Sequence, residues 1–169
     1  MRIYIMKIKF QGNPLTLEGQ QLQMHDSLPD FEVVKNDLSV LSSQDTSGVR
    51  IFLTVPSLDT PVCETEVITF SKLIADMPNV NVYVISMDLP FAQTRWCGAQ
   101  GIKNIHTVSD HRFRSFAMAS GTLIKELGLL TRAAIVVDKD DIVLHVEYLE
   151  EITNQPNYDE ILKFAKAIA

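Results

Sequence analysis

Reactive thiols are scarce in this sequence, since only Cys63 and Cys97 occur among its 169 residues. The two lie 34 positions apart, so the chain lacks a C-x-x-C redox motif, and no cysteine and histidine pattern has the spacing of a zinc site. In a reducing compartment both would normally remain thiols. A disulfide between them is therefore expected to be transient and catalytic rather than structural.

The sequence also lacks an excess of positive charge, long apolar runs and any sign of a boundary between domains. The net charge of -6 argues against nucleic-acid binding, because phosphate recognition usually needs a basic face. The opening MRIYIMKIKF, in which Met6 is a second plausible start, is apolar over too few residues for a signal peptide or a membrane span. A cytoplasmic location follows by default. Without repeats, low-complexity tracts or a Ser/Gly linker, residues 1–169 are expected to form a single domain.

What is present is the composition of an ordinary globular protein, 46% apolar and 21% charged. Near the N-terminus, Lys7–Phe10 and Leu15–Leu17 flank Gly12–Pro14, which predicts a β-hairpin with its turn at the glycine and proline. A second, weaker hairpin is predicted from Val33–Val34 and Val40–Leu41.

The rest of the chain alternates strand and helix patterns. Strands are predicted over residues 49–55, 80–87, 105–108, 132–138 and 142–149, and helices from Pro61 to Pro78, from Pro90 to a glycine at 98 or 101, around 113–119 and over 158–168. This order predicts an α/β fold of thioredoxin-like plan, in which helices flank a mixed central sheet and an N-terminal hairpin precedes it.

Both cysteines follow predicted strands. Cys63 comes after the strand that ends at Val55, and Cys97 comes after the strand that ends at Met87. In α/β sheets the chemistry collects at the carboxyl ends of the parallel strands. The two thiols are therefore expected at the edge of the sheet where functional sites usually lie.

The residues around Cys63 favour a reactive sulfur. Thr60 is suited to the N-cap of a helix and Pro61 to its first position, which places Cys63 in the first turn. The unpaired N–H groups and partial positive charge of a helix N-terminus favour a thiolate over a thiol. Glu64 and Glu66 carry negative charge in the same region and oppose ionisation. A nearby cation would be needed to offset them.

Arg132 is the candidate for that cation, because it begins a strongly apolar strand where a solvated charge would gain nothing. The alternative is that Arg132 is only the polar residue at a strand start. Cys63 could likewise be a buried core thiol, the common state of free cysteine. A Cys-His hydrolase is a further possibility, but the surroundings of the four histidines single out none of them.

The stretch PSLDTPVC resembles the peroxiredoxin active-site pattern P-x-x-x-T-x-x-C through Pro56, Thr60 and Cys63. Three further segments resemble the thiol peroxidase subfamily of atypical two-cysteine peroxiredoxins. They are SMDLPFAQTRWCGAQG with Cys97, LLTRAAIVVD with Arg132, and the opening FQGNPLTLEG. The resemblance covers nearly the whole chain.

The resemblance implies a role for each matched residue. Cys63 would be the peroxidatic thiolate and Cys97 the resolving cysteine. Thr60 would hydrogen-bond the thiolate and the peroxide, Arg132 would stabilise the thiolate and polarise the O–O bond, and Pro56 would shield the pocket from water. The sequence departs from many relatives at Pro61, where they carry glycine, and proline could stiffen this loop.

The resemblance also implies an overall activity. Hydrogen peroxide and organic hydroperoxides would be reduced through a Cys63 sulfenic acid and a Cys63–Cys97 disulfide, which thioredoxin recycles, in antioxidant defence and redox homeostasis. It implies a homodimer, and neither a cofactor nor a metal. Two other functions use the same thiols: a non-catalytic redox sensor that reports oxidant to a partner, and a general dithiol oxidoreductase, which the lack of C-x-x-C disfavours.

Disulfide formation is predicted to unwind part of a helix. Cys97 lies about 10 Å along its helix from Pro90 at about 1.5 Å per residue, and Cys63 begins a different helix. A disulfide requires Cα atoms about 4.4 to 6.8 Å apart. Structures of the reduced and oxidised protein should therefore differ at one of these helix turns at least. Matching Cα positions in both forms would contradict the prediction.

Overall fold

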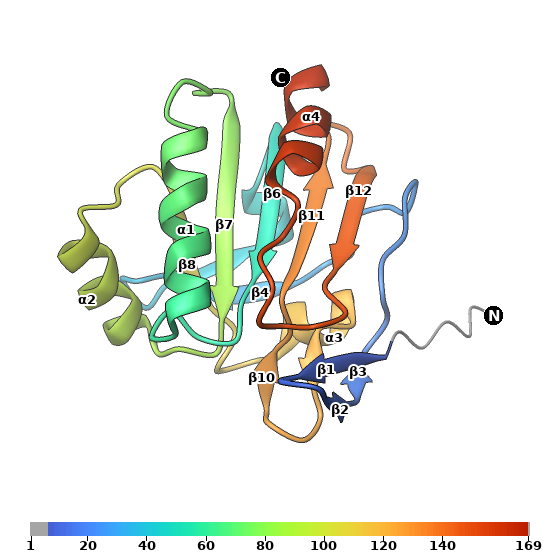
Figure 1. Cartoon of the computed structure of the whole chain (residues 1–169). Helices are drawn as coiled ribbons and strands as arrows, with labels where there is room; N and C mark the ends of the chain where they lie inside the picture. The colour runs from blue at the N-terminus through green and yellow to red at the C-terminus, as the bar shows by residue number, and fades with distance from the viewer. Residues whose placement is uncertain (1–6, 169) are drawn as a thin grey trace.

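A seven-stranded mixed sheet forms the centre of the computed structural model, which describes residues 7–168 (Figure 1). Its strand order is β12-β11-β6-β7-β8-β4-β5. In that order the strands are β12 (Val143–Tyr148), β11 (Ala133–Val137), β6 (Val49–Thr54), β7 (Val80–Ser86), β8 (His106–Ser109), β4 (Glu32–Val34) and β5 (Val40–Ser42). The second candidate start, Met6, lies outside the described residues.

Apolar, β-branched sequence explains the central strands. All six side chains of β6 (VRIFLT) and all five of β11 (AAIVV) are buried, as expected where both faces of a sheet are covered. Strands β6, β7 and β8 run parallel, whereas β11 and β4 are antiparallel to their neighbours β6 and β8. The carboxyl ends of β6, β7 and β8 therefore lie side by side at one end of the sheet, and the N-terminal end of β11 lies at the same end.

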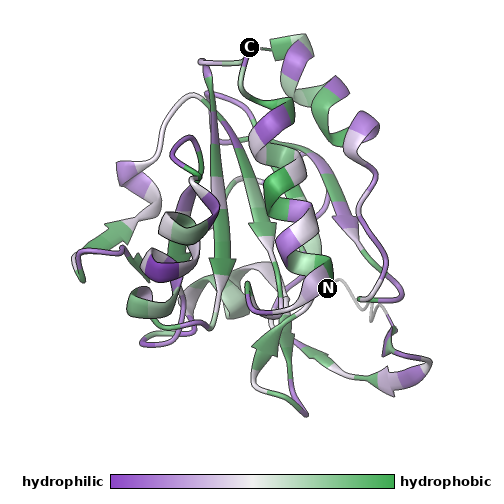
Figure 2. Ribbon diagram, turned by 60° about the vertical axis from the view of Figure 1, so that its left-hand side comes forward, coloured by the Kyte–Doolittle hydropathy of each residue, from purple (hydrophilic) through white to green (hydrophobic). Residues whose placement is uncertain are grey.

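In the part of the chain that the structure describes, four α-helices cover the two faces of this sheet: α1 (Pro61–Leu73), α2 (Pro90–Gln100), α3 (Ser115–Ser120) and α4 (Tyr158–Ile168). Buried residues of α1, α2 and α4 pack in one apolar cluster, and those of α3 pack in a second cluster with the other face. The central strands are coloured mostly hydrophobic, whereas the helices contain both hydrophilic and hydrophobic residues (Figure 2). These layers confirm the predicted α/β, thioredoxin-like plan.

The N-terminal hairpin is present, but its turn is earlier than predicted. Strands β1 (Ile8–Phe10) and β2 (Asn13–Leu15) are joined at Gln11 and Gly12, both of which have positive φ, 51° and 81°. Such a two-residue turn matches the right-handed twist of a hairpin. The prediction that Asn13 and Pro14 belong to the turn was therefore wrong, since both lie in β2.

A further small sheet was not predicted. Strand β3 (Leu17–Glu18) pairs with β9 (Leu123–Ile124), which also pairs with β10 (Leu129–Leu130). Each of these strands has only two residues, too few to show a periodic pattern in the sequence. This sheet fastens the N-terminal segment to the segment that leads into β11, and it lies beside the hairpin (Figure 1).

The remaining elements lie close to their predicted positions. The hairpin of β4 and β5, the hairpin of β11 and β12, and α4 are all present. A short 3₁₀ helix, Ser43–Asp45, follows β5 and was not predicted. Helix α1 ends at Leu73, several residues before Pro78, and α2 ends at Gly101 (φ 67°) rather than at Gly98.

Gly121 is predicted to be intolerant of a side chain because it combines a left-handed backbone with close contact. Its φ is 68°, and an added Cβ would lie 2.5 Å from the backbone nitrogen of Gln21. Gly48 has a similar φ of 71° but nothing within 4 Å of that position. Urea unfolding should show that Gly121→Ala lowers the free energy of unfolding by about 2 kcal/mol more than Gly48→Ala. Equal losses would contradict this account.

Candidate active site

Cys63 lies in the first turn of α1, as predicted. The helix begins at Pro61 with Thr60 at its N-cap position, and the Cys63 side chain is fully buried. The Thr60 hydroxyl does not cap the helix but donates to the backbone carbonyl of Ser57, at 2.9 Å. The amides of the first helical turn are therefore not satisfied by this side chain, and they remain available near the sulfur.

Arg132 contacts Cys63 directly. Its Nη2 donates to the sulfur at 3.1 Å, and its Nε donates to the backbone carbonyl of Ile152 at 2.8 Å. Arg132 immediately precedes β11, whose first residue, Ala133, pairs with Thr54 at the end of β6. The antiparallel pairing thus brings a residue 69 positions away to the start of α1. The sequence-based choice of Arg132 as the cation near Cys63 agrees with this contact.

Glu66 plays a part that the sequence interpretation missed. Its carboxylate accepts a charge-assisted hydrogen bond from Nη1 of Arg132, and both side chains are buried. Glu66 therefore partners the cation rather than only opposing ionisation of Cys63. A signal was present, because Cys63, Val67 and Phe70 mark the buried face of α1 and Glu66 lies on it. A carboxylate at such a position indicates a buried partner.

Burial dominates the electrostatics of this ion pair. Desolvation raises the pKa of Glu66 to about 7, although the Arg132 charge acts in the opposite direction. Desolvation disfavours the Arg132 cation, but the neighbouring Glu66 and Cys63 outweigh it and raise the pKa of Arg132 above its usual value. Arg132 therefore stays charged at neutral pH, next to a sulfur that a positive charge and a donated hydrogen bond would stabilise as a thiolate.

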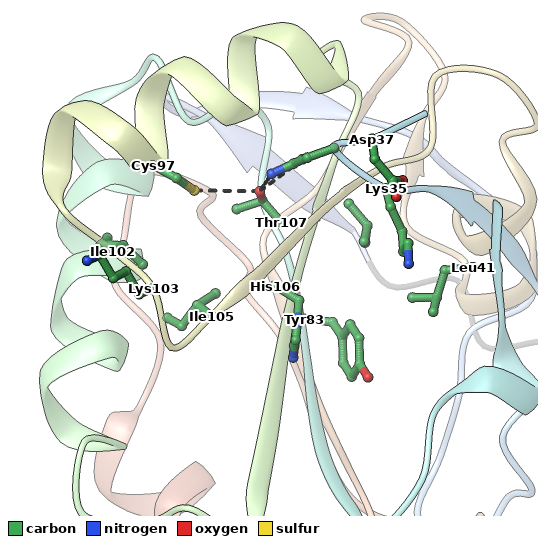
Figure 3. Close-up of a pocket in the computed structure, with 12 residues that line it drawn as sticks. Lys35, Asp37, Leu41, Tyr83, Cys97, Ile102, Lys103, Ile105, His106 and Thr107 are labelled. Carbon is green, nitrogen blue, oxygen red and sulfur yellow. Dashed lines mark hydrogen bonds between the residues drawn. The ribbon is translucent and has the colours of Figure 1, made fainter. Parts of the chain in front are cut away.

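Cys97 lies apart from this cluster, on the last turns of α2. Its thiol is half-buried and lies 3.6 Å from the Thr107 hydroxyl of β8, so it does not contact Cys63 and both thiols are free. Burial raises the pKa of Cys97, against the effect of the Thr107 bond. Cys97 points toward Thr107 at the border of a cavity of about 460 Å³ (Figure 3). In this structure the Cys97 thiol is therefore held at Thr107, and its burial favours the thiol over the thiolate.

Pro56 lies two residues after β6 and is partly buried in the turn that leads to Thr60.

Among residues 7–168, no group of three or more His, Cys, Asp or Glu side chains is arranged to hold a metal ion. Within the same residues, no helix is long and apolar enough to cross a bilayer.

Comparison with known proteins agrees with this geometry. The Redoxin family model matches residues 23–162. A thiol peroxidase from Clostridium acetobutylicum is 52% identical over 162 residues, which cover 96% of this chain and 99% of the relative. The chain belongs to the thiol peroxidases of the Redoxin family. A thiol peroxidase from Bacillus subtilis is 47% identical over 163 residues, or 96% of this chain and 98% of that relative.

The solved structures give the same result for the fold. A peroxiredoxin-like protein from Aquifex aeolicus superposes with a TM-score of 0.91 at 40% identity, covering 98% of this chain and 99% of that one. The family and the thioredoxin-like fold that the motifs indicated are both confirmed. The chain is thus a thiol-dependent peroxidase, which favours an enzyme over a non-catalytic sensor or a general dithiol oxidoreductase.

The raised pKa of Glu66 predicts a pH dependence of stability. Because the folded-state value of about 7 exceeds the ordinary 4.5, this group's contribution is fully present below about pH 4.5 and is lost as pH rises through about 7. Urea unfolding of the wild type and Glu66→Gln between pH 4.5 and 8 checks this. The wild type should lose more stability than Glu66→Gln over that range. The same slope in both proteins would contradict the prediction.

Proposed function

We propose that Cys63 is the peroxidatic cysteine, and that its contact with Arg132 is the observation that carries this assignment. A guanidinium Nη2 at 3.1 Å from the sulfur is buried with it and held in place by Glu66 and the Ile152 carbonyl. Cys63 also packs in the apolar cluster of α1, but a cysteine that only filled the core would have no cation against its sulfur. The buried cation supports a sulfur that works as a thiolate.

The first step follows from this arrangement. The Cys63 thiolate attacks the terminal oxygen of the peroxide, the O–O bond breaks, and the other oxygen leaves as water or an alcohol after taking a proton. Sulfur is oxidised to a sulfenic acid and the peroxide is reduced. Arg132 and the free amides of the first α1 turn are fixed donors for the charge that develops on the leaving oxygen.

Thr60 and Pro56 complete the proposed pocket. The Thr60 hydroxyl gives its proton to the Ser57 carbonyl, so it does not donate to the Cys63 thiolate in this structure, although its oxygen at the N-cap can accept a hydrogen bond from a peroxide. Pro56 carries no N–H group and lies in the same turn, which suits a role in keeping water from the sulfur. Both roles come from the family resemblance of PSLDTPVC.

Cys97 is the proposed resolving cysteine. Its thiolate attacks the sulfur of the Cys63 sulfenic acid, the S–O bond breaks, hydroxide leaves and becomes water, and an S–S bond forms. Both thiols are free, Cys63 is fully buried in α1 and Cys97 is bonded to Thr107 from α2, so we expect helix turns to open before the sulfurs meet. The break between Cys97 and Thr107 is part of that change.

The reductant, assembly and location belong to the same proposal. Thioredoxin would reduce the Cys63–Cys97 disulfide by thiol exchange, with hydrogen peroxide and organic hydroperoxides as substrates. The protein would act as a homodimer in the cytoplasm, and residues 1–169 would form one domain. The similarity to thiol peroxidases over nearly the full chain supports these expectations.

Steady-state kinetics with thioredoxin, thioredoxin reductase and several peroxides test the cysteine roles. Cys63→Ser should abolish peroxide consumption, because no sulfenic acid can form. Cys97→Ser should still react once with peroxide but should lose thioredoxin-coupled turnover, because no intramolecular disulfide can form. Full coupled turnover in Cys97→Ser would show that the resolving assignment is wrong.

The Arg132→Lys variant tests whether the contact between Arg132 and the Cys63 sulfur activates Cys63. A lysine keeps the charge but cannot bond Cys63, Glu66 and the Ile152 carbonyl from one planar group, so kcat/KM for peroxide should fall by about 10². Arg50→Lys is the matched control, since Arg50 is equally buried but bonds Asp141 instead. Equal losses in the two variants would mean that Arg132 acts only through stability.

A further inference from the structure

Asp88, in the connection from β7 to α2, holds together two segments that carry the two cysteines. Its Oδ1 accepts a hydrogen bond from the Ser57 hydroxyl at 2.7 Å. Its Oδ2 accepts bonds from the Leu58 amide at 2.8 Å and the Ser86 hydroxyl at 2.7 Å. One carboxylate thus binds the turn before Cys63 and the end of β7 at the same time.

On one side, Asp88 supports the turn that precedes Cys63. The carbonyl of Ser57 accepts both the amide and the hydroxyl of Thr60, at 3.2 and 2.9 Å. The side chain of the same serine is bonded to Asp88. The position of Thr60 at the start of α1 is therefore tied, through Ser57, to the carboxylate of Asp88.

On the other side, the bonds continue into α2. The Gln93 side-chain amide donates to the Ser86 hydroxyl at 3.1 Å and to the Val108 carbonyl at 2.8 Å. Gln93 and Ser86 are completely buried. Ser86 thus joins Asp88 to the first turn of the helix that carries Cys97, and buried hydrogen bonds of this kind are costly to break.

At the opposite end of α2, the side-chain hydrogen bond to α1 is exposed. There the Gln100 side chain donates to Glu64 of α1 at 3.2 Å, and this bond is exposed to solvent. Exposed side-chain hydrogen bonds contribute little, because water replaces them. The bonds that run from Asp88 through Ser86 to Gln93 are thus better protected from water than the Gln100–Glu64 bond, so we expect the segments bonded to Asp88 to stay fixed when helix turns open.

We propose that Asp88 is a positioning residue for disulfide formation. It anchors the Ser57–Thr60 turn and the start of α2 at the carboxyl end of β7. The unwound Cys97 segment is thereby placed to meet the Cys63 sulfenic acid. In this step the Cys97 thiolate forms the S–S bond, and hydroxide leaves Cys63 and becomes water. This inference rests on the function proposed above.

Asp88 should affect this step more than the reaction with peroxide. The sulfur of Cys63 is bonded by Arg132, which Glu66 and Ile152 hold, and none of these contacts involves Asp88. Activation of the thiolate therefore persists without the Asp88 carboxylate. The relative placement of the two cysteine segments, in contrast, is lost without the Asp88 carboxylate. Misplacing reacting groups by about 1 Å can lower a reaction rate by about 10².

Rapid mixing of the reduced protein with hydrogen peroxide separates the two steps. Trp96, the only tryptophan, is buried beside Cys97 on α2, so its fluorescence reports the opening of that helix. Mass spectrometry of quenched samples counts sulfenic acid, disulfide and sulfinic acid. The variants are Asp88→Ala, which removes all three bonds, and Asp88→Asn, whose amide can accept from Leu58 and Ser86 and donate to Ser57. Asp59→Ala, an exposed carboxylate in the same turn, is the control.

We expect Asp88→Ala to slow disulfide formation about tenfold and to accumulate sulfinic acid, with oxidation of Cys63 slowed less than threefold. Asp88→Asn and Asp59→Ala should behave like the wild type. Equal slowing of both steps, an unchanged disulfide rate, or an Asp88→Asn as slow as Asp88→Ala would overturn the proposal.

Two further measurements keep the test decisive. If Asp88→Ala does not fold, Ser57→Ala removes the hydroxyl bridge to Asp88, together with the acceptor of the exposed Asp59 amide, and should slow the same step by a smaller factor. An unchanged disulfide rate in Ser57→Ala would then count against the anchor. If the wild type itself forms no Cys63–Cys97 disulfide, the proposed function fails, which is a different result from a wild-type rate in Asp88→Ala.

Discussion

The guanidinium of Arg132 is the group on which the arrangement of this site depends. It bonds the Cys63 sulfur, the Glu66 carboxylate and the Ile152 carbonyl, and it is almost inaccessible to water. A buried arginine without partners would destabilise the fold by several kcal/mol. Glu66 accepts a hydrogen bond from the guanidinium and carries the opposite charge when it is ionised, so the cation has a partner beside a sulfur that has to ionise. Stability and reactivity therefore use the same three contacts.

The sheet topology explains why these groups meet. Strands β6, β7 and β8 are parallel, so the segments after them begin at one edge, where α1 and α2 start. Strand β11 is antiparallel to β6, and this places Arg132 at that edge although it precedes its strand. Because β11 runs antiparallel to β6, the residue at its start lies beside the residues that follow β6. This is why Arg132 is close to Cys63.

Sequence patterns predicted the strands of the central sheet, both β-hairpins on it and α4. The longer of these elements show apolar periodicity, whereas β4 and β5 have only three residues each. The patterns missed β9 and β10, since two-residue strands are defined by their partners and not by a pattern. The hairpin turn was misplaced because Gln11 adopts a positive φ that favours glycine or asparagine. At the site, the sequence offered Cys63 and Arg132 as candidates and the structure brings them into contact, whereas it gave no indication of the pairing of Glu66 with Arg132 or of the bonds of Asp88.

The sequence by itself determined which residues are chemically competent. It placed Cys63 in a first helical turn, named Arg132 as the cation, and carried the motifs of a thiol peroxidase. Only the tertiary structure decided how charge is shared, because Glu66 is a repulsive neighbour along the helix and a counter-ion once Arg132 arrives from 66 residues away. Electrostatic interactions depend on distance and burial in space, and neither can be read from positions along a chain.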